Sequence, residues 1–477
     1  TEKRFTLPSY HWMPSGRQIL LSSQNDLYLM DTTSKKVQQL TNDELVERDP
    51  TPSPDGKYVA YIKDHNLWVT DISTKTEKPL TREGDKDILI GQFDWVYEEE
   101  FSIRTGFAWS PDSKKIAFYR IDQTHVPEYT LTDFLPLYSI PHVMKYPKAG
   151  QPNAVVKIGI IDKSNGDIVW VDKSAGPDSY IPRIKWAPDG TSLALTYLNR
   201  AQNHLLVLCA DAQTGITRQL LEERVENGWL EPKRDIHFIK GKNEFVWMAE
   251  KNGFNHLYLY DGEGILKNPI TTGNWDVRNI YRVTENTVYF SASEKREESH
   301  LFSVKLNGKA LRRITIEAGT HTINMSPSGR YYIDNFSTWE KPTMQTLYKS
   351  NGEKIILLNN PQVRALSDCA LAPIRFFEFT TSTGHILPAY LITPADFDSS
   401  KKYPVLVYTY AGPGSQVVAN RWHGTRGFWY SYLAQQGYLI FATDGRGTAF
   451  QGREWKHMLY KQLGQVEIED QIEGAKY

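Results

Sequence analysis

The sequence predicts a mainly β protein, in which a repeated antiparallel region precedes an α/β region. Two observations carry this prediction. A turn phrase that feeds a short apolar strand returns along the first 360 residues, and from about residue 374 continuous apolar strands alternate with helical segments. Because 477 residues are too many for one ordinary domain, we expect at least two domains, residues 1–365 and residues 366–477.

The turn phrase occurs five times in the antiparallel region. Its copies are WMPSGRQILL from Trp12, PSPDGKYVAY from Pro52, WSPDSKKIAF from Trp109, WAPDGTSLAL from Trp186 and MSPSGRYYID from Met325. Proline presets φ at the start of such a turn, Asp or Ser bonds back to the backbone, and Gly accepts a positive φ. The alternating apolar run after each copy predicts a strand.

Paired strands with polar or glycine-bearing turns lie between these copies. They cover residues 66–81, 157–172, 256–271 and 300–315. Repeats of a few antiparallel strands, spaced by tens of residues, are typical of a β-propeller, whose blades bury their faces against each other. A stacked β-sandwich is the alternative, but the same turn phrase returns too often for it. The spacing of the copies varies, so we expect insertions in some blades.

The clearest insertion is the segment 126–153, which is rich in proline and aromatic residues. We expect an arm near residues 127–149. Its apolar side chains Phe134, Leu135, Leu137 and Tyr138 have no core of their own, so the arm should pack against another surface.

The α/β region is predicted from four segments. Residues 403–414 read as an apolar strand ending in a Gly/Pro turn, and residues 428–437 as a short helix closed by glycine. A second buried strand at 438–447 and a helix at 466–477 follow. Apolar strands that alternate with helices indicate a parallel sheet.

Composition and charge exclude several classes of function. The 55 basic and 56 acidic residues nearly cancel, so no global field points to nucleic acid or to an anionic membrane. No apolar run approaches the roughly 18 residues that span a bilayer. Cys209 and Cys369 match no disulfide or zinc spacing, and we expect buried free thiols. The 12 histidines show no metal-binding spacing, and we expect no metal or cofactor.

One short stretch has an unusual charge pattern. In GQFDWVYEEEFS, residues 91–102, an aromatic run ends in Glu98, Glu99 and Glu100. Adjacent carboxylates repel each other and persist together where a cation shares the site. The protonated α-amino group of a peptide is one such cation, because carboxylates accept its donors in charge-assisted hydrogen bonds. A solvated acidic turn, paired with nearby lysine or arginine, is the alternative.

Five segments in chain order carry a resemblance to a known family. They are DWVYEEEFS, YPKAGQPN, YTYAGPGSQ, DGRGTAFQG and LGQVEIEDQIEGAK. With these segments, almost the whole chain resembles dipeptidyl peptidase IV within the prolyl oligopeptidase family of serine peptidases. The resemblance implies an eight-bladed propeller followed by an α/β-hydrolase domain. It also implies an enzyme that releases dipeptides from peptide amino termini, with Pro or Ala at the second position.

The resemblance also assigns roles to individual residues. Glu99 and Glu100 align with the glutamates that clamp the substrate's amino terminus, and Tyr410 aligns with the oxyanion-hole tyrosine. Arg48 is a candidate for the arginine that holds the substrate's carbonyl oxygen, although a surface ion pair is an alternative for it. We expect Glu98 to be structural, and the DGRG segment at 444–447 to shape a loop without direct chemistry.

Two further residues of the glutamate motif, Asp94 and Trp95, are expected to serve packing and turn support. Clamping the amino terminus at a fixed distance from the nucleophile leaves only the second peptide bond within reach. Peptides with a free amino terminus are therefore the expected substrates.

The sequence departs from the family in one respect: it contains no G-x-S-x-G pentapeptide, the nucleophile elbow of α/β-hydrolases. The resemblance places the catalytic Ser, Asp and His beyond Tyr477, so the chain as printed is expected to lack the acyl-enzyme step. Truncation or loss is favoured over a natural non-catalytic relative, because a sheet cut before its central strand exposes edges. A prolyl tripeptidyl peptidase and a non-catalytic propeller binding protein are the alternative functions.

The resemblance finally implies an assembly and a compartment. Relatives of this type dimerise through a blade arm and the hydrolase domain, so we expect a homodimer that uses the arm at 127–149. A periplasmic or secreted location is implied as well.

Overall fold

The protein is described by a computed structural model that covers residues 9–231, 235–363, 366 and 371–477. The chain forms two compact units, Thr1–Ile236 and His237–Tyr477, which are described separately. The predicted boundary between residues 365 and 366 lies among positions of which only residue 366 is described, and it remains a prediction.

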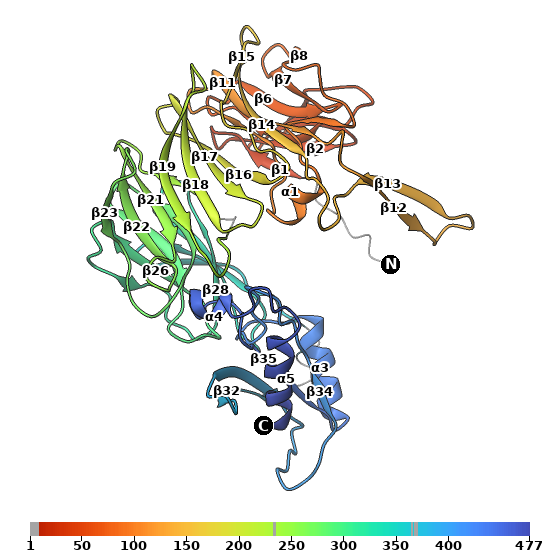
Figure 1. The fold of residues 1–477 in the computed structure, drawn as a ribbon, viewed down its shortest axis with the longest axis vertical. Coiled ribbons are helices and arrows are strands. Elements are labelled where there is room, and N and C mark those ends of the chain that lie inside the picture. The colour runs from red at the N-terminus through yellow and green to blue at the C-terminus, as the bar shows by residue number, and fades with distance from the viewer. Residues whose placement is uncertain (1–8, 232–234, 364–365, 367–370) are drawn as a thin grey trace. The chain divides into compact units, whose positions relative to one another are not determined.

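Among its described residues, the first unit contains four antiparallel sheets of four or five strands, besides a two-stranded hairpin (Figure 1). The first sheet comprises β1 (Tyr10–Trp12), β2 (Gln18–Ser23), β3 (Asp26–Asp31) and β4 (Val37–Gln39); the second comprises β5 (Arg48–Pro52), β6 (Tyr58–Lys63), β7 (Asn66–Asp71) and β8 (Glu77–Pro79). The third comprises β9 (Ile88–Ile90), β10 (Phe107–Trp109), β11 (Lys115–Asp122), β14 (Val155–Asp162) and β15 (Ile168–Trp170). The fourth comprises β16 (Ser179–Trp186), β17 (Ser192–Asn199), β18 (His204–Asp211) and β19 (Thr217–Arg224).

The second unit begins with three more sheets of this kind. The fifth sheet comprises β20 (His237–Phe238), β21 (Glu244–Ala249), β22 (His256–Asp261) and β23 (Leu266–Pro269); the sixth comprises β24 (Val277–Val283), β25 (Thr287–Ala292), β26 (His300–Lys305) and β27 (Arg312–Arg313). The seventh comprises β28 (Thr320–Met325), β29 (Tyr331–Ser337), β30 (Met344–Lys349) and β31 (Lys354–Asn359). The described residues thus form seven meanders, whereas the resemblance implies eight blades.

The recurring turn phrase has the predicted place in these meanders. Each of its five copies forms the turn between two neighbouring strands of one sheet. These pairs are β1 and β2, β5 and β6, β10 and β11, β16 and β17, and β28 and β29. In the second sheet the Ser53 hydroxyl donates to Asp55 at 2.6 Å and accepts from the Tyr58 N–H at 3.0 Å. Gly56 has a φ of 71°, which favours glycine. The turn chemistry therefore sets where the second strand begins.

A second repeated device closes four of the sheets. A threonine that follows the outermost strand accepts a hydrogen bond from the N–H of a leucine on the third strand, 14 residues earlier. The pairs are Leu27 and Thr41, Leu67 and Thr81, Leu257 and Thr271, and Leu301 and Thr315, at 2.9 to 3.0 Å. These bonds are buried, so each satisfies a backbone donor away from water. The recurrence indicates that the sheets are copies of one structural unit.

The last sheet is mixed and does not have the predicted wholly parallel arrangement. It comprises β32 (Ile374–Thr380), β33 (Ile386–Ile392), β35 (Leu439–Thr443) and β34 (Val405–Val407), in that spatial order. Only β34 and β35 pair in parallel. The strands β32 and β33 are joined by a short turn, which forces an antiparallel pair. The predicted strands and helices exist, but the prediction of a parallel sheet is corrected for this part.

The helices of the second unit lie in this region. They are α3 (Thr425–Gln435), α4 (Arg453–His457) and α5 (Val466–Lys476). The helix α3 begins three residues before its predicted start and is followed by Gly437, whose φ is 83°. Its buried Tyr430 packs with Tyr390, Ile392 and Ile440 of the sheet, so the helix is held by the apolar face that the sequence predicts for it.

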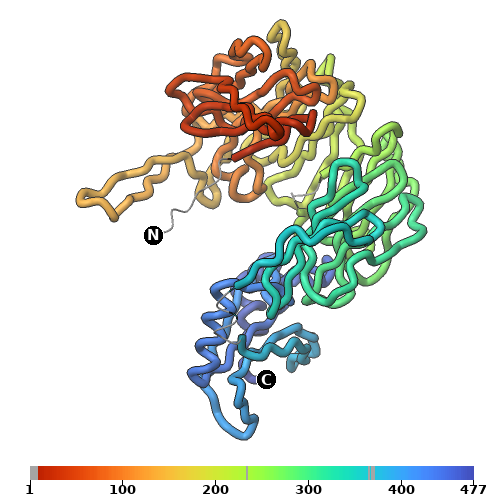
Figure 2. The backbone as a smooth tube through the Cα atoms, turned by 180° about the vertical axis from the view of Figure 1, so that it is seen from behind, coloured from red at the N-terminus to blue at the C-terminus, as the bar shows by residue number. Residues whose placement is uncertain are grey.

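The predicted arm is a two-stranded hairpin inserted between β11 and β14. Its strands are β12 (Glu128–Asp133) and β13 (Ile140–Lys145), and the hairpin projects from the sheets of the first unit (Figures 1 and 2). At its tip Leu135 is 97% and Leu137 is 93% exposed. Within the described chain this apolar tip has no packing partner.

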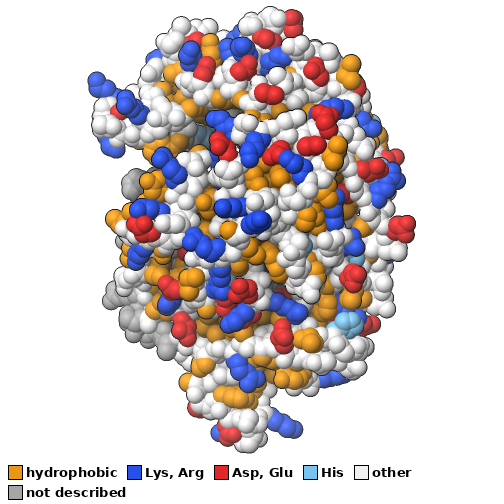
Figure 3. All heavy atoms as spheres, turned by 90° about the vertical axis from the view of Figure 1, so that its left-hand side faces the viewer, with side chains coloured by type: hydrophobic (Ala, Val, Ile, Leu, Met, Phe, Trp, Pro, Cys, Tyr) orange, Lys and Arg blue, Asp and Glu red, His pale blue; other side chains and the backbone are white. Residues whose placement is uncertain are grey.

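The distribution of surface charge and the state of Cys209 are those that the sequence predicts. Basic and acidic side chains are interspersed over the face drawn in Figure 3. None of the described helices combines the length and the apolar character needed to cross a membrane. Cys209 is buried and free as predicted, while Cys369 lies outside the described residues.

Candidate functional site

The three consecutive glutamates lie on a short helix, α1 (Trp95–Glu99), and at its C-cap. The buried Asp94 is the N-cap, and its Oδ1 accepts a hydrogen bond from the Tyr97 N–H at 3.0 Å. An N-cap carboxylate satisfies a donor that the first turn leaves unpaired. The Trp95 ring packs against Tyr146, with 4.5 Å between ring centroids. Asp94 and Trp95 thus have the supporting roles that the sequence predicts.

A buried aromatic cluster holds the other face of α1. Tyr97 stacks on Phe93 at 5.6 Å between ring centroids and meets Phe101 edge-on at 5.1 Å, while Phe101 meets Tyr180 at 5.1 Å. The Tyr97 hydroxyl also accepts a hydrogen bond from the Ile181 N–H at 3.0 Å. Aromatic pairs of this geometry add about 0.5 to 1.5 kcal/mol beyond area burial. The helix that carries the glutamates is therefore fixed to strand β16.

The glutamates themselves point away from this cluster. Glu98, Glu99 and Glu100 are all exposed. Within the described part of the chain, none of their carboxylates has a lysine or arginine nitrogen within ion-pair distance. Among the described residues, no lysine or arginine forms the ion pair that the alternative of a paired acidic turn requires. Three like charges lie side by side without a counter-ion in the part of the chain that the structure describes.

Sequence reasoning missed one residue that supports this turn. The half-buried Arg183 donates from Nη2 to the carbonyl oxygen of Phe101 at 3.0 Å and from Nη1 to that of Pro182 at 2.6 Å. Burial lowers the pKa of its guanidinium. The bond to Phe101 fixes the backbone immediately after Glu100. The aromatic face that packs behind α1 could have been predicted from the sequence, because Phe93, Tyr97 and Phe101 are spaced four residues apart.

Arg48 is not brought to the glutamates by any described interaction. It is the exposed first residue of β5 and neighbours Asp49, whose φ of 54° marks the bulge there. Among the residues the structure covers, it forms no hydrogen bond or ion pair with Glu99 or Glu100. Its assignment to substrate binding remains a prediction.

Tyr410 lies in the second unit, three residues after β34, with 68% of its surface exposed. The Ser415 hydroxyl lies 2.7 Å from the carbonyl oxygen of Tyr410 and 2.6 Å from that of Gly412. These contacts close the Gly/Pro turn on itself. The phenol oxygen of Tyr410 has no hydrogen-bond partner among the described residues, so its donor is available.

The DGRG segment holds the loop that follows Tyr410. Asp444 is buried, and its two carboxylate oxygens accept from the N–H groups of Val417 and Val418, each at 2.8 Å. The Ala449 N–H donates to the Ser415 carbonyl oxygen at 2.8 Å. Burial raises the pKa of Asp444 to about 6. These contacts agree with the expectation that the segment shapes a loop.

The same segment is joined to the last sequence motif. Arg446 Nε lies 2.9 Å from Asp470 Oδ1, its Nη2 lies 2.8 Å from the same oxygen, and its backbone N–H donates to Oδ2 at 2.6 Å. Such a fork pairs a guanidinium with a carboxylate in a fixed geometry. Gly447 has a φ of 90°, and a Cβ there would lie 2.0 Å from Leu459. Only glycine therefore fits between this loop and the helix region.

Only one group of carboxylates in the described residues converges as metal ligands do. Oxygens of Asp43, Glu47 and Glu77 lie within 4.8 Å of one another. The ammonium of buried Lys63 lies among them, 2.5 Å from Asp43 and 3.6 Å from Glu47, and also contacts Glu77. Burial raises the pKa of Glu47 to about 7. The lysine supplies the positive charge at this position, so the cluster is a structural ion pair between the first two sheets.

The N-cap of α1 leads to a prediction about stability and pH. Burial raises the pKa of Asp94 to about 6, from 3.8 in the open chain. A raised pKa means that the folded state favours the protonated form of the carboxyl group. Its contribution to the free energy of unfolding is complete below about pH 4 and is lost as pH rises through about 6. Asp94→Asn keeps the cap acceptor without the charge. We expect the variant to be the more stable protein at pH 8 and to match the wild type near pH 4.

Thermal unfolding between pH 4 and 8 measures this difference. The exposed Glu99→Gln on the same helix is the control and should follow the wild-type pH profile, because the pKa of Asp94 is raised by burial and by the charge of Glu98, which this variant keeps. Identical pH profiles for Asp94→Asn and the wild type would contradict the prediction.

Comparisons with known proteins bear on this arrangement. The family described as "Dipeptidyl peptidase IV (DPP IV) N-terminal region" matches residues 13–343, and the "Prolyl oligopeptidase family" matches residues 426–477. The chain is 31% identical to "Probable dipeptidyl-aminopeptidase B" of Uncinocarpus reesii, over 89% of this chain and 50% of the relative. It is 29% identical to "Probable dipeptidyl peptidase 4" of Emericella nidulans, over 94% of this chain and 62% of the relative.

A solved structure resembles the fold closely. The crystal structure of Porphyromonas gingivalis dipeptidyl peptidase 4 matches all of this chain with a TM-score of 0.91 and 31% identity, and 70% of its own length is covered. The chain spans between half and about two thirds of the curated relatives named above. On these matches, the chain belongs to the prolyl oligopeptidase family, as a member of the dipeptidyl peptidase IV type.

Proposed function

We propose that this protein is a serine exopeptidase that releases dipeptides from peptide amino termini, with Pro or Ala at the second position. In this proposal the chain supplies the clamp for the substrate's amino terminus, through Glu99 and Glu100, and one hydrogen-bond donor of the oxyanion hole, through Tyr410. The names of the matched relatives support the reaction class. No residue of this chain is assigned to the nucleophilic step.

The observation that carries the proposal is the set of exposed carboxylates on a rigidly held helix. Glu99 and Glu100 have no internal cation among the described residues, and the face behind them is fixed by Tyr97 and Phe101. A protonated α-amino group has three N–H donors and one positive charge. Two carboxylates can accept hydrogen bonds from these donors and balance the charge. Because the helix is fixed, the amino group would be held at a constant position, and the second peptide bond alone would be presented for cleavage.

Tyr410 fits the second role on chemical grounds. Its phenol is exposed and has no described partner, and the turn that carries it is closed by Ser415 and Asp444. A positioned donor stabilises the negative charge that develops on the carbonyl oxygen during acyl transfer. The exposed donor on a fixed turn supports the assignment.

The proposal includes the arrangement of the sheets and of the assembly. The seven meanders are proposed to be blades of a propeller, with the α/β-hydrolase region following from about residue 366. The exposed apolar tip at Leu135 and Leu137 supports a homodimer formed through the arm and the hydrolase region, and sedimentation velocity of the protein tests it. A periplasmic or secreted location is proposed from the family resemblance, and fractionation of cells tests it.

Chromophore release from Gly-Pro-p-nitroanilide tests the function, in a protein that joins this chain to the nucleophilic residues of the proposed reaction. We expect hydrolysis of the substrate with a free amino terminus and none of its N-acetylated form, because acetylation removes the charge that the clamp binds. Equal hydrolysis of both substrates would contradict the clamp. Cleavage of Ala-Ala-Pro-p-nitroanilide in preference to Gly-Pro-p-nitroanilide would favour the tripeptidyl peptidase instead.

A further inference from the structure

The second unit contains a cavity that the proposed function does not use. It has a volume of about 650 Å³ and lies between β24, β26 and the loop that follows β35. Its walls include Phe254, Trp275, Arg278, Arg296, Phe302 and Phe450. Pockets of roughly 300 to 1,000 Å³ with an apolar lining and a few polar groups are typical of small-molecule sites.

Arg278 is the polar group that distinguishes this cavity. Its guanidinium is largely buried and donates from Nη2 to the carbonyl oxygen of Arg296 at 2.9 Å and from Nη1 to Gln416 Oε1 at 3.4 Å. Its Nε–H has no hydrogen-bond partner, and among the described residues no carboxylate lies within ion-pair distance of it. Burial lowers the pKa of Arg278 to about 10, so the group is still charged at neutral pH.

This charge is costly without an anion. A buried charge that lacks a counter-ion destabilises the folded state. A carboxylate that pairs with it offsets the free energy lost when the charge was removed from water. A guanidinium has five N–H donors in a planar fork, of which only two are used here. The unused donors match the geometry of a carboxylate.

The aromatic wall beside Arg278 is held in a strained conformation. The Phe450 ring centroid lies 3.9 Å from Arg278 Cζ, and the φ of Phe450 is 66°, a region that non-glycine residues seldom adopt. Strain of this kind persists where the surroundings enforce it, and it concentrates at functional sites. The loop is anchored next to Phe450, because the Gly452 N–H donates to Asp276 at 2.9 Å and the Arg453 N–H to the Gly253 carbonyl oxygen at 2.6 Å.

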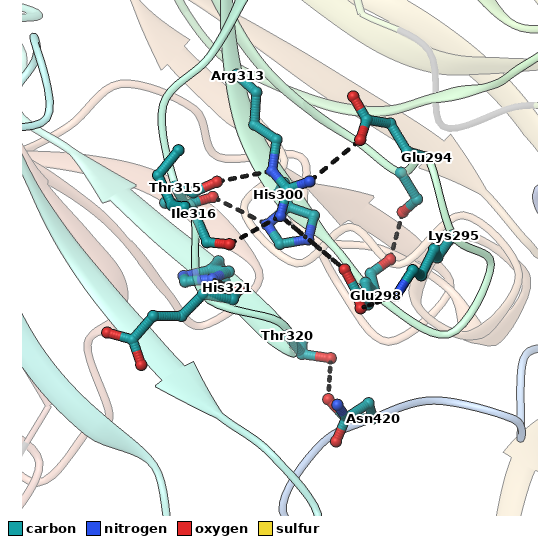
Figure 4. Close-up of polar contacts among 12 residues, drawn as sticks. Glu294, Lys295, Glu298, His300, Arg313, Thr315, Ile316, Thr320, His321 and Asn420 are labelled. Carbon is teal, nitrogen blue, oxygen red and sulfur yellow. Dashed lines mark hydrogen bonds and ion pairs between the residues drawn. The ribbon is translucent and has the colours of Figure 1, made fainter. Parts of the chain in front are cut away.

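Two carboxylates also line the cavity, but each is committed elsewhere. Asp276 accepts from the backbone N–H of Asn255 at 2.6 Å and from that of Gly452 at 2.9 Å. Glu294 pairs with Arg313 at 3.1 Å (Figure 4). Neither lies within ion-pair distance of Arg278, although the charge of Asp276 offsets part of the effect of burial on the pKa of Arg278, so the guanidinium keeps an unpaired N–H for an anion.

The loop between β25 and β26 forms a fixed wall rather than a mobile flap. Figure 4 shows the buried cluster behind it, in which His300 lies 2.8 Å from Glu298 and 3.0 Å from Arg313. The Asn420 N–H donates to the carbonyl oxygen of Glu297 at 2.7 Å. Because the wall is fixed at several points, the cavity exists before any ligand enters.

We propose that this cavity is a binding site for a small carboxylate with an apolar or aromatic body. The carboxylate pairs with Arg278, and the body lies against the rings of Trp275, Phe302 and Phe254. Two sources share this chemistry, the carboxyl terminus of a peptide and a free aromatic acid. The site shares no residue with the proposed clamp, and the proposal does not depend on the clamp.

Calorimetric titration of the protein at pH 7 with 3-phenylpropanoate and with 3-phenylpropanamide tests the proposal. We expect the acid to bind at least tenfold more tightly than the amide, because only the acid pairs with Arg278. Arg278→Gln should weaken acid binding at least tenfold. Arg282→Gln is the matched control, since Arg282 is exposed on the same strand and does not line the cavity, and it should leave binding unchanged.

The comparison of acid and amide uses the unaltered protein, so it holds even if Arg278→Gln fails to fold. Equal binding of acid and amide, absence of acid binding, or full acid binding by a folded Arg278→Gln protein would each overturn the proposal. N-acetyl-Ala-Phe, whose blocked amino group cannot occupy the glutamate clamp, identifies the source. Tighter binding than 3-phenylpropanoate supports the peptide carboxyl terminus, and equal or weaker binding supports the free acid. A failed clamp would leave these outcomes unchanged.

Discussion

Replacement of Glu99 or Glu100 by glutamine is expected to raise KM for free-amine substrates roughly 10- to 100-fold, which corresponds to about 1.4 to 3 kcal/mol for a charge-assisted hydrogen bond. The amine is bound equally in the ground state and in the transition state, so kcat should change much less. Glutamine keeps the size of the side chain but removes its charge. Steady-state kinetics with Gly-Pro-p-nitroanilide, in a protein that joins this chain to the nucleophilic residues of the proposed reaction, measure both constants.

The adjacent Glu98→Gln is the matched control for this experiment. It has the same exposure and the same change of charge on the same turn of chain, yet the proposal gives it no contact with substrate. A KM effect of equal size in all three variants would indicate a general loss of negative potential, and unchanged kinetics in Glu99→Gln and Glu100→Gln would rule out the clamp.

Replacement of Tyr410 by phenylalanine is expected to lower kcat by roughly 100- to 1,000-fold, the usual effect of removing one oxyanion-hole donor. The phenol is proposed to donate only to the charge that develops in the transition state, so KM should stay nearly constant. Stability should not change, because the hydroxyl has no partner among the described residues and the ring is exposed.

The control for Tyr410→Phe is Tyr432→Phe. Tyr432 is also an exposed tyrosine, but it lies on α3. Both variants should show the wild-type melting temperature, which separates a catalytic effect from a folding defect. A fall in kcat below tenfold for Tyr410→Phe, with the protein folded, would remove Tyr410 from the oxyanion hole.

Much of the fold followed from local sequence chemistry. The copies of the turn phrase, such as PSPDG at Pro52, were predicted to start strands and do so, because Pro, Ser, Asp and Gly act within a few residues of chain. The arm was found for a similar reason, since a long insertion with an apolar tip at Leu135 cannot bury itself. The helices α3 and α5 were recognised from their apolar spacing and from the glycine after α3.

The strand order of the mixed sheet could not be predicted from local sequence chemistry. Residues of β33 and β35 are 47 or more positions apart, and neither segment contains a local signal that fixes which strand pairs with which. Strand order depends on how several apolar faces are buried at once. The sequence predicted the strands, but the antiparallel place of β33 beside β35 followed from tertiary packing.

The same division applies to the candidate site. The sequence singled out Glu99, Glu100 and Tyr410 by residue type and motif. It did not reveal that Tyr97 bonds the backbone of Ile181, 84 residues away, or that Asp444 holds Val417 and Val418. Those bonds decide how rigidly the side chains are presented.

The cavity at Arg278 marks the limit of inference from sequence. A lone arginine in a strand has no local feature that states whether a counter-ion will reach it. By itself, the sequence determined the turns, the strands, the arm and the chemical types at the site, because these depend on neighbouring residues. Only the tertiary structure decided which of the described carboxylates have no cation, and which described cation has no carboxylate, within ion-pair distance among the described residues, because burial and pairing depend on residues far apart in the chain.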